Sequence, residues 1–315
     1  MFRTVVIREG EHISVRENWM VVKSSQGEAK VPLEDLYCVV LDNRQAAITV
    51  PCITALTGAG VHVVVCDEKH LPASVMYGLN THYRPLGTLR YQVTMPQEEK
   101  DVYWKLIVQA KLRNQARVLQ ISGVHRERWQ RLEQWAMEVE DGDEGNREGI
   151  GAKWYFRSLF GSEFLRMMDD GINQAMNYGY AILRSAVAKA LVSYGYNCVI
   201  GLHHINESNP FNLADDMMEP LRPVVDLWVD MHHEDLLYEL TRQQRTELID
   251  LMNTEILWNG KKMRLRNAID RYISSFTTAL LRGQPQRLCI PEVKKLKRCE
   301  EDEEDEPVHE NHCDV

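Results

Sequence analysis

The periodicity of the hydrophobic residues changes once along the chain, near residue 80, and this change restricts the fold more than any other feature. Before it, short runs rich in β-branched and aromatic residues are separated by turn-forming residues. These runs cover residues 2–8, 12–16, 19–23, 29–32, 37–41, 46–50 and 61–66. Beyond residue 97 the apolar residues recur every three or four positions. The sequence therefore predicts an α+β protein, with a small N-terminal β-rich domain followed by a larger all-α domain.

Turn-forming residues mark the boundary between the two parts. Gly78, Asn80, Pro85, Gly87 and Pro96 gather in one stretch, which indicates a linker. At the other end of the chain, a block of acidic residues with few apolar neighbours is typical of a disordered segment. The predicted division is a β-rich domain at 1–77, a linker at 78–96, an α-helical domain at 97–290 and a charged, disordered tail at 291–315.

The helical domain is expected to begin with one long helix. Trp104, Val108, Leu112, Ala116 and Leu119 are three or four residues apart, so they define one buried face. Further helices are predicted at 125–139, 146–159, 170–194, 211–219, 224–232, 241–257 and 263–282.

The sequence lacks the features of membrane and secreted proteins. None of its apolar runs approaches the roughly 20 residues that a membrane-spanning helix needs. Residues 1–17 alternate apolar and polar side chains, so we expect a strand there and not a signal peptide. The seven cysteines include no Cys-x-x-Cys pair, which disfavours a disulfide framework or a zinc knuckle. We expect a protein of the reducing cytoplasm with no membrane partner.

The net charge of −9 is unevenly distributed and does not decide whether the protein binds nucleic acid. Residues 299–315 contain nine acidic residues and no lysine or arginine, whereas residues 1–298 contain 37 acidic and 37 basic residues. A neutral body is compatible with a basic face, but no strongly basic DNA-binding domain is present. Charge therefore neither supports nor excludes DNA as a partner.

Glu148 is the first candidate for chemistry. It lies at a predicted helix start, next to the small residues Gly149, Gly151 and Ala152. Small residues let a ligand, a metal ion or another part of the backbone come close to a carboxylate. A glutamate in the first turn also interacts favourably with the helix dipole whatever its function, so this residue alone does not define a site.

Two further polar segments lie downstream. In the first, an apolar run ends at Gly201 and is followed by His203 and His204 in a polar loop, where a pair of histidines is also typical of an ordinary surface. In the second, Asp216 and Glu219 are three residues apart and share one helical face. These acids repel one another unless they are solvated or a cation lies between them.

Glu148, His204 and Glu219, with Asp216 as a supporting acid, together have the ligand types of a divalent metal site. Carboxylates with one imidazole suit Mg²⁺ or Mn²⁺ better than a structural zinc ion. Such an ion polarises a phosphoryl oxygen and activates a water molecule or a terminal hydroxyl group for attack.

These segments resemble the CRISPR-associated protein one family, the spacer-acquisition integrases and endonucleases. The similarity extends over residues 1–290, and it is carried by REGIGAKWYF (147–156), NQAMNYGYAILRS (173–185), GLHH (201–204) and LADDMMEPLRP (213–223). By this resemblance, Glu148, His204 and Glu219 fall on the catalytic metal ligands and Asp216 on the accompanying acid. The DDMMEPLRP form is similar to the branch (type II) that accompanies a single large effector nuclease.

The resemblance implies an activity and an assembly. The activity is insertion of captured foreign DNA as new spacers into a CRISPR array, in which a DNA 3′-OH attacks a repeat phosphodiester. The assembly is a homodimer formed through the N-terminal domains, joined by the small CRISPR-associated protein two into a heterohexamer. Independently of the resemblance, the β-rich domain has apolar residues on both faces, which suggests a buried homodimer contact. These residues are Val5, Ile7, Val39, Val63 and Val65.

Basic residues of the helical domain are candidates for DNA phosphate contacts, although each also fits a solvated helix face. They are Lys153, Arg157, Arg184, Arg222, Lys261, Lys262, Arg264, Arg266 and Arg271.

Two other functions are compatible with these residues. One is a stand-alone metal-dependent nuclease that acts on branched or single-stranded DNA, which shortens strands without joining them. The other is a non-catalytic scaffold that binds partners through its acidic tail. A scaffold has no use for a converging charge cluster, so the presence of all three candidate ligands disfavours it.

Overall fold

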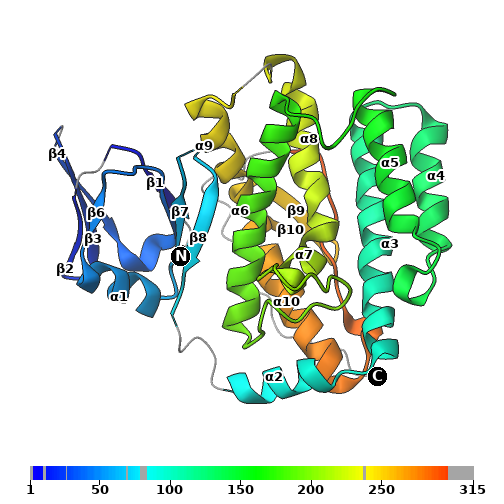
Figure 1. The fold of residues 1–315 in the computed structure, drawn as a ribbon, viewed down its shortest axis with the longest axis horizontal. Coiled ribbons are helices and arrows are strands. Elements are labelled where there is room, and N and C mark those ends of the chain that lie inside the picture. The colour runs from blue at the N-terminus through cyan, green and yellow to red at the C-terminus, as the bar shows by residue number, and fades with distance from the viewer. Residues whose placement is uncertain are drawn as a thin grey trace.

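The computed structural model describes residues 3–9, 12–25, 27–68, 70–78, 84–236 and 239–296. Figure 1 shows β-sheets at one end of the molecule and helices filling the rest. The predicted fold class, an N-terminal β-rich part followed by a mostly helical part, is confirmed. Its division at residues 77, 96 and 290 stays a prediction.

Two four-stranded sheets form the N-terminal part. The strands are β1 (Arg3–Ile7), β2 (His12–Arg16), β3 (Trp19–Ser24), β4 (Gly27–Pro32), β5 (Leu36–Leu41), β6 (Ala47–Ile48), β7 (His62–Cys66) and β8 (Pro72–Met76). One sheet has the order β1-β5-β7-β8, with β1, β5 and β7 parallel and β8 antiparallel. The other has the order β4-β3-β2-β6. The helix α1 (Val50–Gly58) packs beside them, with Pro51 in its first turn.

The central strand β5 is buried on both faces, and this explains the apolar residues on both sides of the sheet. Leu36 and Val39 pack into the core of the β-rich part, whereas Val40 packs into the core of the helical part. Val63 is likewise fully buried within this chain. The helical domain therefore covers the second face of the sheet. The apolar pattern does not require a partner subunit, so it no longer supports a homodimer.

Ten α-helices occur within the described ranges. Those after α1 are α2 (Pro85–Thr94), α3 (Gln97–Ile121), α4 (Arg126–Met137), α5 (Arg147–Phe160), α6 (Gly171–Ser193), α7 (Asn212–Met218), α8 (Arg222–His232), α9 (Arg242–Asp250) and α10 (Leu265–Arg282). Short 3₁₀ turns follow α7 at Glu219–Leu221 and α9 at Leu251–Asn253.

The long helix α3 runs through the helical domain, between the α4–α5 pair and the α7–α8 segment (Figure 1). All five residues of its predicted apolar face are buried, none more than 2% exposed. The same helix also buries three polar residues, Lys111, Asn114 and Gln115. The prediction of an apolar stripe is confirmed, and two of these exceptions, Lys111 and Asn114, bear on the site described below.

The helical part departs from the predicted elements at two places. Residues of the predicted linker form α2, because Pro85 occupies the first helical position, where proline is favourable. The predicted helix 241–257 ends early, and β9 (Glu255–Trp258) and β10 (Lys261–Arg264) form a hairpin around Asn259 and Gly260. An Asn-Gly pair is the preferred turn of such a hairpin.

The segment after residue 290 is ordered at its beginning, contrary to the prediction of a disordered tail from 291. Glu292 pairs with Leu257 of β9 through two backbone hydrogen bonds of 2.7 and 3.0 Å. Val293 is 1% exposed, and its N–H donates to the Asn114 side chain. The acidic block that begins at residue 300 lies outside the described residues. Within the described ranges, no helix is both long and apolar enough to span a membrane.

Candidate active site

Glu148 lies in the first turn of α5, where two preceding side chains cap the helix. Asp143 accepts hydrogen bonds from the N–H groups of Arg147 and Glu148, both at 2.9 Å. Asn146, in the left-handed conformation with φ of 48°, accepts one from the Gly149 N–H at 3.2 Å. These bonds satisfy the free N–H groups at the helix start and fix the direction in which the Glu148 side chain leaves it.

Gly151 allows α5 to pack directly on α3. An added Cβ at this position would overlap with a methyl group of Leu112. The small residues next to Glu148 were expected to let a ligand, a metal ion or the backbone approach the carboxylate. At Gly151 the neighbour that comes close is α3, and the close packing brings Glu148 toward the Lys111 side chain.

The loop that carries His204 is organised around the carboxylate of Asp216, which is fully buried on α7. One of its oxygens accepts hydrogen bonds from the N–H groups of Leu202 and His203, at 2.6 and 3.1 Å. The other accepts from the His204 N–H at 3.1 Å and contacts its Nδ1 at 2.6 Å. Gly201 is required beside it, because a Cβ there would overlap with the His204 carbonyl oxygen.

Asp216 also sets the orientation of the His204 ring. With Nδ1 donating to the carboxylate, Nε2 is the ring nitrogen left to accept a proton or bind a metal ion. The hydrogen bond that His204 donates to Asp216 raises the pKa of His204, and it outweighs the opposite effect of partial burial. The negative charge of Glu219 contributes in the same direction, although more weakly.

Trp104 of α3 packs against both histidines. Its ring is stacked on His203 with 4.3 Å between ring centroids, and it meets His204 edge to face at 5.8 Å. Trp104 is 2% exposed, so the stack forms one wall of the site. This role was not predicted, because Trp104 was assigned only to the apolar face of its helix.

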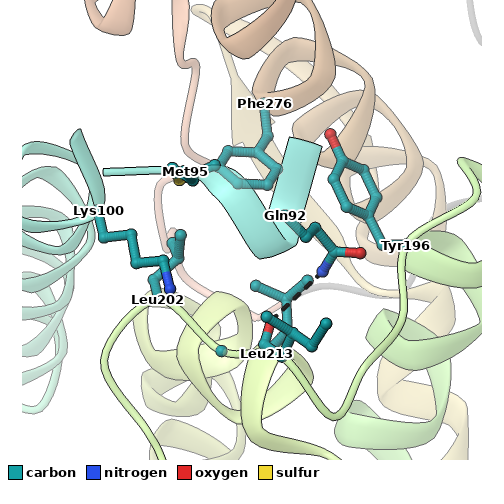
Figure 2. A pocket seen from close by; sticks show the side chains of 9 residues that line it. Gln92, Met95, Lys100, Tyr196, Leu202, Leu213 and Phe276 are labelled. Atoms are coloured by element: carbon teal, nitrogen blue, oxygen red, sulfur yellow. Dashed lines mark hydrogen bonds between the residues drawn. The ribbon is translucent and has the colours of Figure 1, made fainter. Parts of the chain in front are cut away.

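Helix α2 is hydrogen-bonded to residues 197–200, the segment that precedes the two histidines. The Gln92 amide donates to the carbonyl groups of Asn197 and Ile200, at 3.0 and 3.3 Å, and accepts from the Asn197 N–H at 2.8 Å. Figure 2 shows Gln92 in a cavity lined by Met95, Tyr196 and Phe276. That cavity has a volume of about 10 Å³, which admits one water molecule and no larger ligand.

Glu219 lies in the 3₁₀ turn between α7 and α8 and is 5% exposed. Pro220 and Pro223 prevent one continuous helix here. The turn is held by Asn114 of α3, whose amide donates to the Pro220 carbonyl at 2.7 Å. Arg222 lies with its Nε 2.9 Å from one Glu219 oxygen. Glu219 therefore projects from a fixed turn toward α3.

Lys111 joins the two glutamates. Its ammonium group donates to Glu148 and to Glu219, and the residue is 5% exposed. Burial alone would lower the pKa of Lys111, but the two carboxylates raise it. Burial would conversely raise the pKa of Glu219, but Arg222 and Lys111 hold it well below its usual range. Lys111 and Glu219 are therefore both charged at neutral pH.

The predicted metal ligands are only partly assembled in this arrangement. Glu148 and Glu219 meet at a single cation, as two ligands of one ion do, but that cation is the Lys111 ammonium. His204 is turned toward Asp216. Among the described residues, no three His, Cys, Asp or Glu side chains are arranged to hold a metal ion together. The donor types fit Mg²⁺ or Mn²⁺, whereas this side-chain arrangement fits a bound ammonium group.

A polar pocket of about 270 Å³ opens on the other side of Arg222. Its lining includes Arg166, Arg184 and Arg222, together with Asn177, Tyr180 and one carboxylate, that of Asp215, which lies 3.8 Å from Arg184. The Arg222 guanidinium group lies 4.7 Å from the centroid of the Tyr180 ring, and that of Arg166 lies 5.4 Å from it. Three guanidinium groups around one polar pocket form a site suited to an anion.

Residues 4–232 match the model of a family described as CRISPR associated protein Cas1. A CRISPR-associated endonuclease Cas1 from Neisseria meningitidis serogroup C (strain 8013) is 36% identical to the chain over 298 residues. That match covers 94% of this chain and 98% of the relative. The chain belongs to the Cas1 family.

Two solved structures share the Cas1 fold seen here. A casposase bound to integration product aligns with a TM-score of 0.70 at 18% identity, over 90% of this chain and 91% of that one. A Cas6-RT-Cas1–Cas2 complex aligns with a TM-score of 0.69 at 18% identity, over 93% of this chain and 36% of that one. At these identities the likeness concerns the fold alone.

The other residues predicted to contact DNA are distributed over the Cas1 fold. Lys153 and Arg157 are exposed on α5, Lys261 and Lys262 on β10, and Arg271 on α10, whereas Arg264 is half-buried. The prediction is wrong for Arg266, which is 2% exposed and donates to the Asn253 side chain. Its place at the start of α10 turns it into the protein, where the Tyr37 ring lies 5.9 Å away.

Proposed function

We propose that this Cas1-family chain is a metal-dependent DNA integrase and endonuclease that inserts captured DNA fragments as new spacers into a CRISPR array. In this reaction, a fragment's 3′-OH attacks a repeat phosphodiester, and hydrolysis is the same attack by water. The family assignment supports the proposal, as does the relative from Neisseria meningitidis, which is named an endonuclease. The observation that carries it is that Glu148 and Glu219 converge on one cation, here the Lys111 ammonium group. An arginine-lined pocket lies beside them.

Glu148, Glu219 and His204 are the proposed ligands of a Mg²⁺ or Mn²⁺ ion. When bound, such an ion supplies a Lewis acid for the phosphoryl oxygen. The chain's own contribution is orientation. Asp216 accepts the Nδ1–H of His204 and so leaves Nε2 as the ring nitrogen that would bind the ion, and Trp104 restricts the movement of the ring.

The pocket of Arg166, Arg184 and Arg222 is proposed to bind DNA phosphate groups next to the reacting phosphodiester. Guanidinium groups hold phosphate oxygens with two parallel hydrogen bonds. Arg222 contacts Glu219 on one side and lines this pocket on the other, so it links the two places. Arg184 and Arg222 were predicted DNA contacts, and Arg166 is added by the structure. The candidates for contacts farther along the DNA stay Lys153, Arg157, Lys261, Lys262, Arg264 and Arg271.

The proposed assembly is a homodimer joined by the small CRISPR-associated protein two into a heterohexamer. The likeness to a Cas6-RT-Cas1–Cas2 complex supports a partner of the Cas2 type. The homodimer and the heterohexameric stoichiometry rest on the family resemblance alone. The same resemblance places the chain in the branch that accompanies a single large effector nuclease.

A strand-joining assay tests the proposal and separates it from a stand-alone nuclease on branched or single-stranded DNA. Labelled fragment, the companion protein, Mn²⁺ or Mg²⁺ and a supercoiled plasmid carrying the CRISPR repeat are incubated together. We expect the label to become covalently attached to the plasmid. A fragment whose 3′ end lacks the hydroxyl group is the control, and it should not be joined. Shortened fragments without any joined product would favour the nuclease instead.

A further inference from the structure

Lys111 is a charged residue at a position where the helix pattern calls for an apolar one. It lies seven residues after Trp104 and three after Val108, on the buried face of α3. Burial of an ammonium group is unfavourable unless charged partners surround it. Glu148 of α5 and Glu219 of the 3₁₀ turn supply those partners.

The charges at this place are balanced without any metal ion. Two carboxylates, Glu148 and Glu219, face two cations, Lys111 and Arg222. A divalent ion bound by both carboxylates would lie between them, which is where the ammonium group now lies. An ion in that place would compete with the ammonium group for the same carboxylate oxygens, and their like charges repel one another.

The two cations beside Glu219 differ in their freedom to move. Arg222 is stacked over the Tyr180 ring, with its guanidinium carbon 4.7 Å from the ring centroid. Lys111 has a flexible four-carbon stem, and the two carboxylates are the partners of its ammonium group. Of the two cations, Lys111 is therefore the one whose side chain is freer to leave Glu219.

We propose that Lys111 is a positioning residue whose ammonium group holds Glu148 and Glu219 together in the metal-free protein and is displaced when a divalent ion binds. Without it, the two carboxylates would repel one another and α5 would lose a tie to the turn after α7. The inference rests on the proposed function, because it takes Glu148 and Glu219 as metal ligands.

Metal affinity and stability of Lys111→Met, measured on the full chain, test this inference. Methionine has a similar length and no charge. We expect the Kd for Mn²⁺, measured by calorimetry at fixed pH, to fall by about tenfold or more, because a competing charge is gone. The Tm in EDTA should fall, because Glu148 and Glu219 then face each other without the ammonium group between them, and Mn²⁺ should raise the Tm more than in the wild type.

Lys105→Met is the matched control. Lys105 lies on the same helix, with its ammonium group 2.9 Å from Asp141 in a partly exposed pair, so its loss should leave the Kd for Mn²⁺ unchanged. Lys111→Gln, which keeps a polar side chain, is the second variant if Lys111→Met does not fold, and its Kd should also fall.

The outcomes separate the inference from the proposed function. An unchanged Kd for Mn²⁺ in both Lys111 variants would overturn the inference. If Lys111 only stabilises the fold, the variants should have a lower Tm and an unchanged Kd. Weaker Mn²⁺ binding would also overturn it, because Lys111 would then act together with the ion. If the wild type itself binds no Mn²⁺, the proposed metal-dependent function fails, and the inference fails with it.

Discussion

At the scale of single residues, Asp226 of α8 links charge to stability. Its side chain is 1% exposed and accepts a hydrogen bond from the Tyr180 hydroxyl group. Burial raises its pKa from 3.8 to about 6, against the opposing effects of Tyr180 and of the Arg166 charge. The folded protein therefore holds a proton here more tightly than the unfolded chain does. The associated stability is complete below pH 3.8 and is lost as the pH rises through about 6.

Asp226→Asn should remove this pH dependence, because the amide stays neutral and its oxygen still accepts from Tyr180. Relative to the variant, the wild type should lose about 2–3 kcal/mol of unfolding free energy between pH 4 and pH 8. Urea unfolding at several pH values measures the difference. Asp235→Asn, at an exposed position, is the control. An Asp226→Asn difference that is constant over this range would contradict the assignment.

At the scale of elements, the contact between α3 and α5 decides where Glu148 lies. Gly151→Ala places a methyl group against Leu112, so α5 must move away from α3. We expect a loss of about 1–3 kcal/mol of unfolding free energy, together with weaker Mn²⁺ binding. Gly87→Ala on α2 is the matched control. Its Cβ meets no atom within 4 Å, so it should stabilise the protein by up to about 1 kcal/mol. Equal effects of the two substitutions on unfolding would contradict this account of the contact.

The predicted elements succeed where a local pattern repeats and fail where it is short. The apolar stripe of α3 extends over several turns, and it is buried as predicted. The β9–β10 hairpin was missed because apolar residues from Leu248 to Ile256 keep a helix-like spacing up to the first strand. The Asn259-Gly260 pair was the local signal for that hairpin. Helix α2 was missed because Pro85 and Gly87 were treated as breakers, although proline is favourable in a first turn.

The candidate site was predictable only as far as local sequence carries it. Glu148, His204 and Glu219 stand in short segments with distinctive composition, so the sequence alone singled them out. Lys111 and Trp104 reach the site through the packing of α3 against other helices, which no local pattern reveals. A lysine on a buried helical stripe was nevertheless a visible signal of a charged partner. Whether the three residues bind a metal ion stays a prediction.

At the scale of the whole molecule, the β-rich and helical parts form one continuous packing arrangement. The sheet containing β5 contributes to the cores of both parts, so the domains are joined by buried apolar contacts. Residues 1–298 are electrically neutral, and the arginine pocket therefore represents a local concentration of positive charge. DNA binding through such a pocket is expected to weaken strongly with rising salt concentration.

The central claim, that Glu219 serves chemistry and not DNA binding, is tested most directly by strand joining with Glu219→Gln. The variant keeps the side-chain volume but removes the charge that faces Lys111 and the proposed metal ion. Glu207→Gln, in the exposed part of the histidine loop, is the control, and circular dichroism confirms folding. We predict that joining falls by about a hundredfold or more while DNA affinity stays close to wild type. Near-normal joining by folded Glu219→Gln would contradict the proposed site.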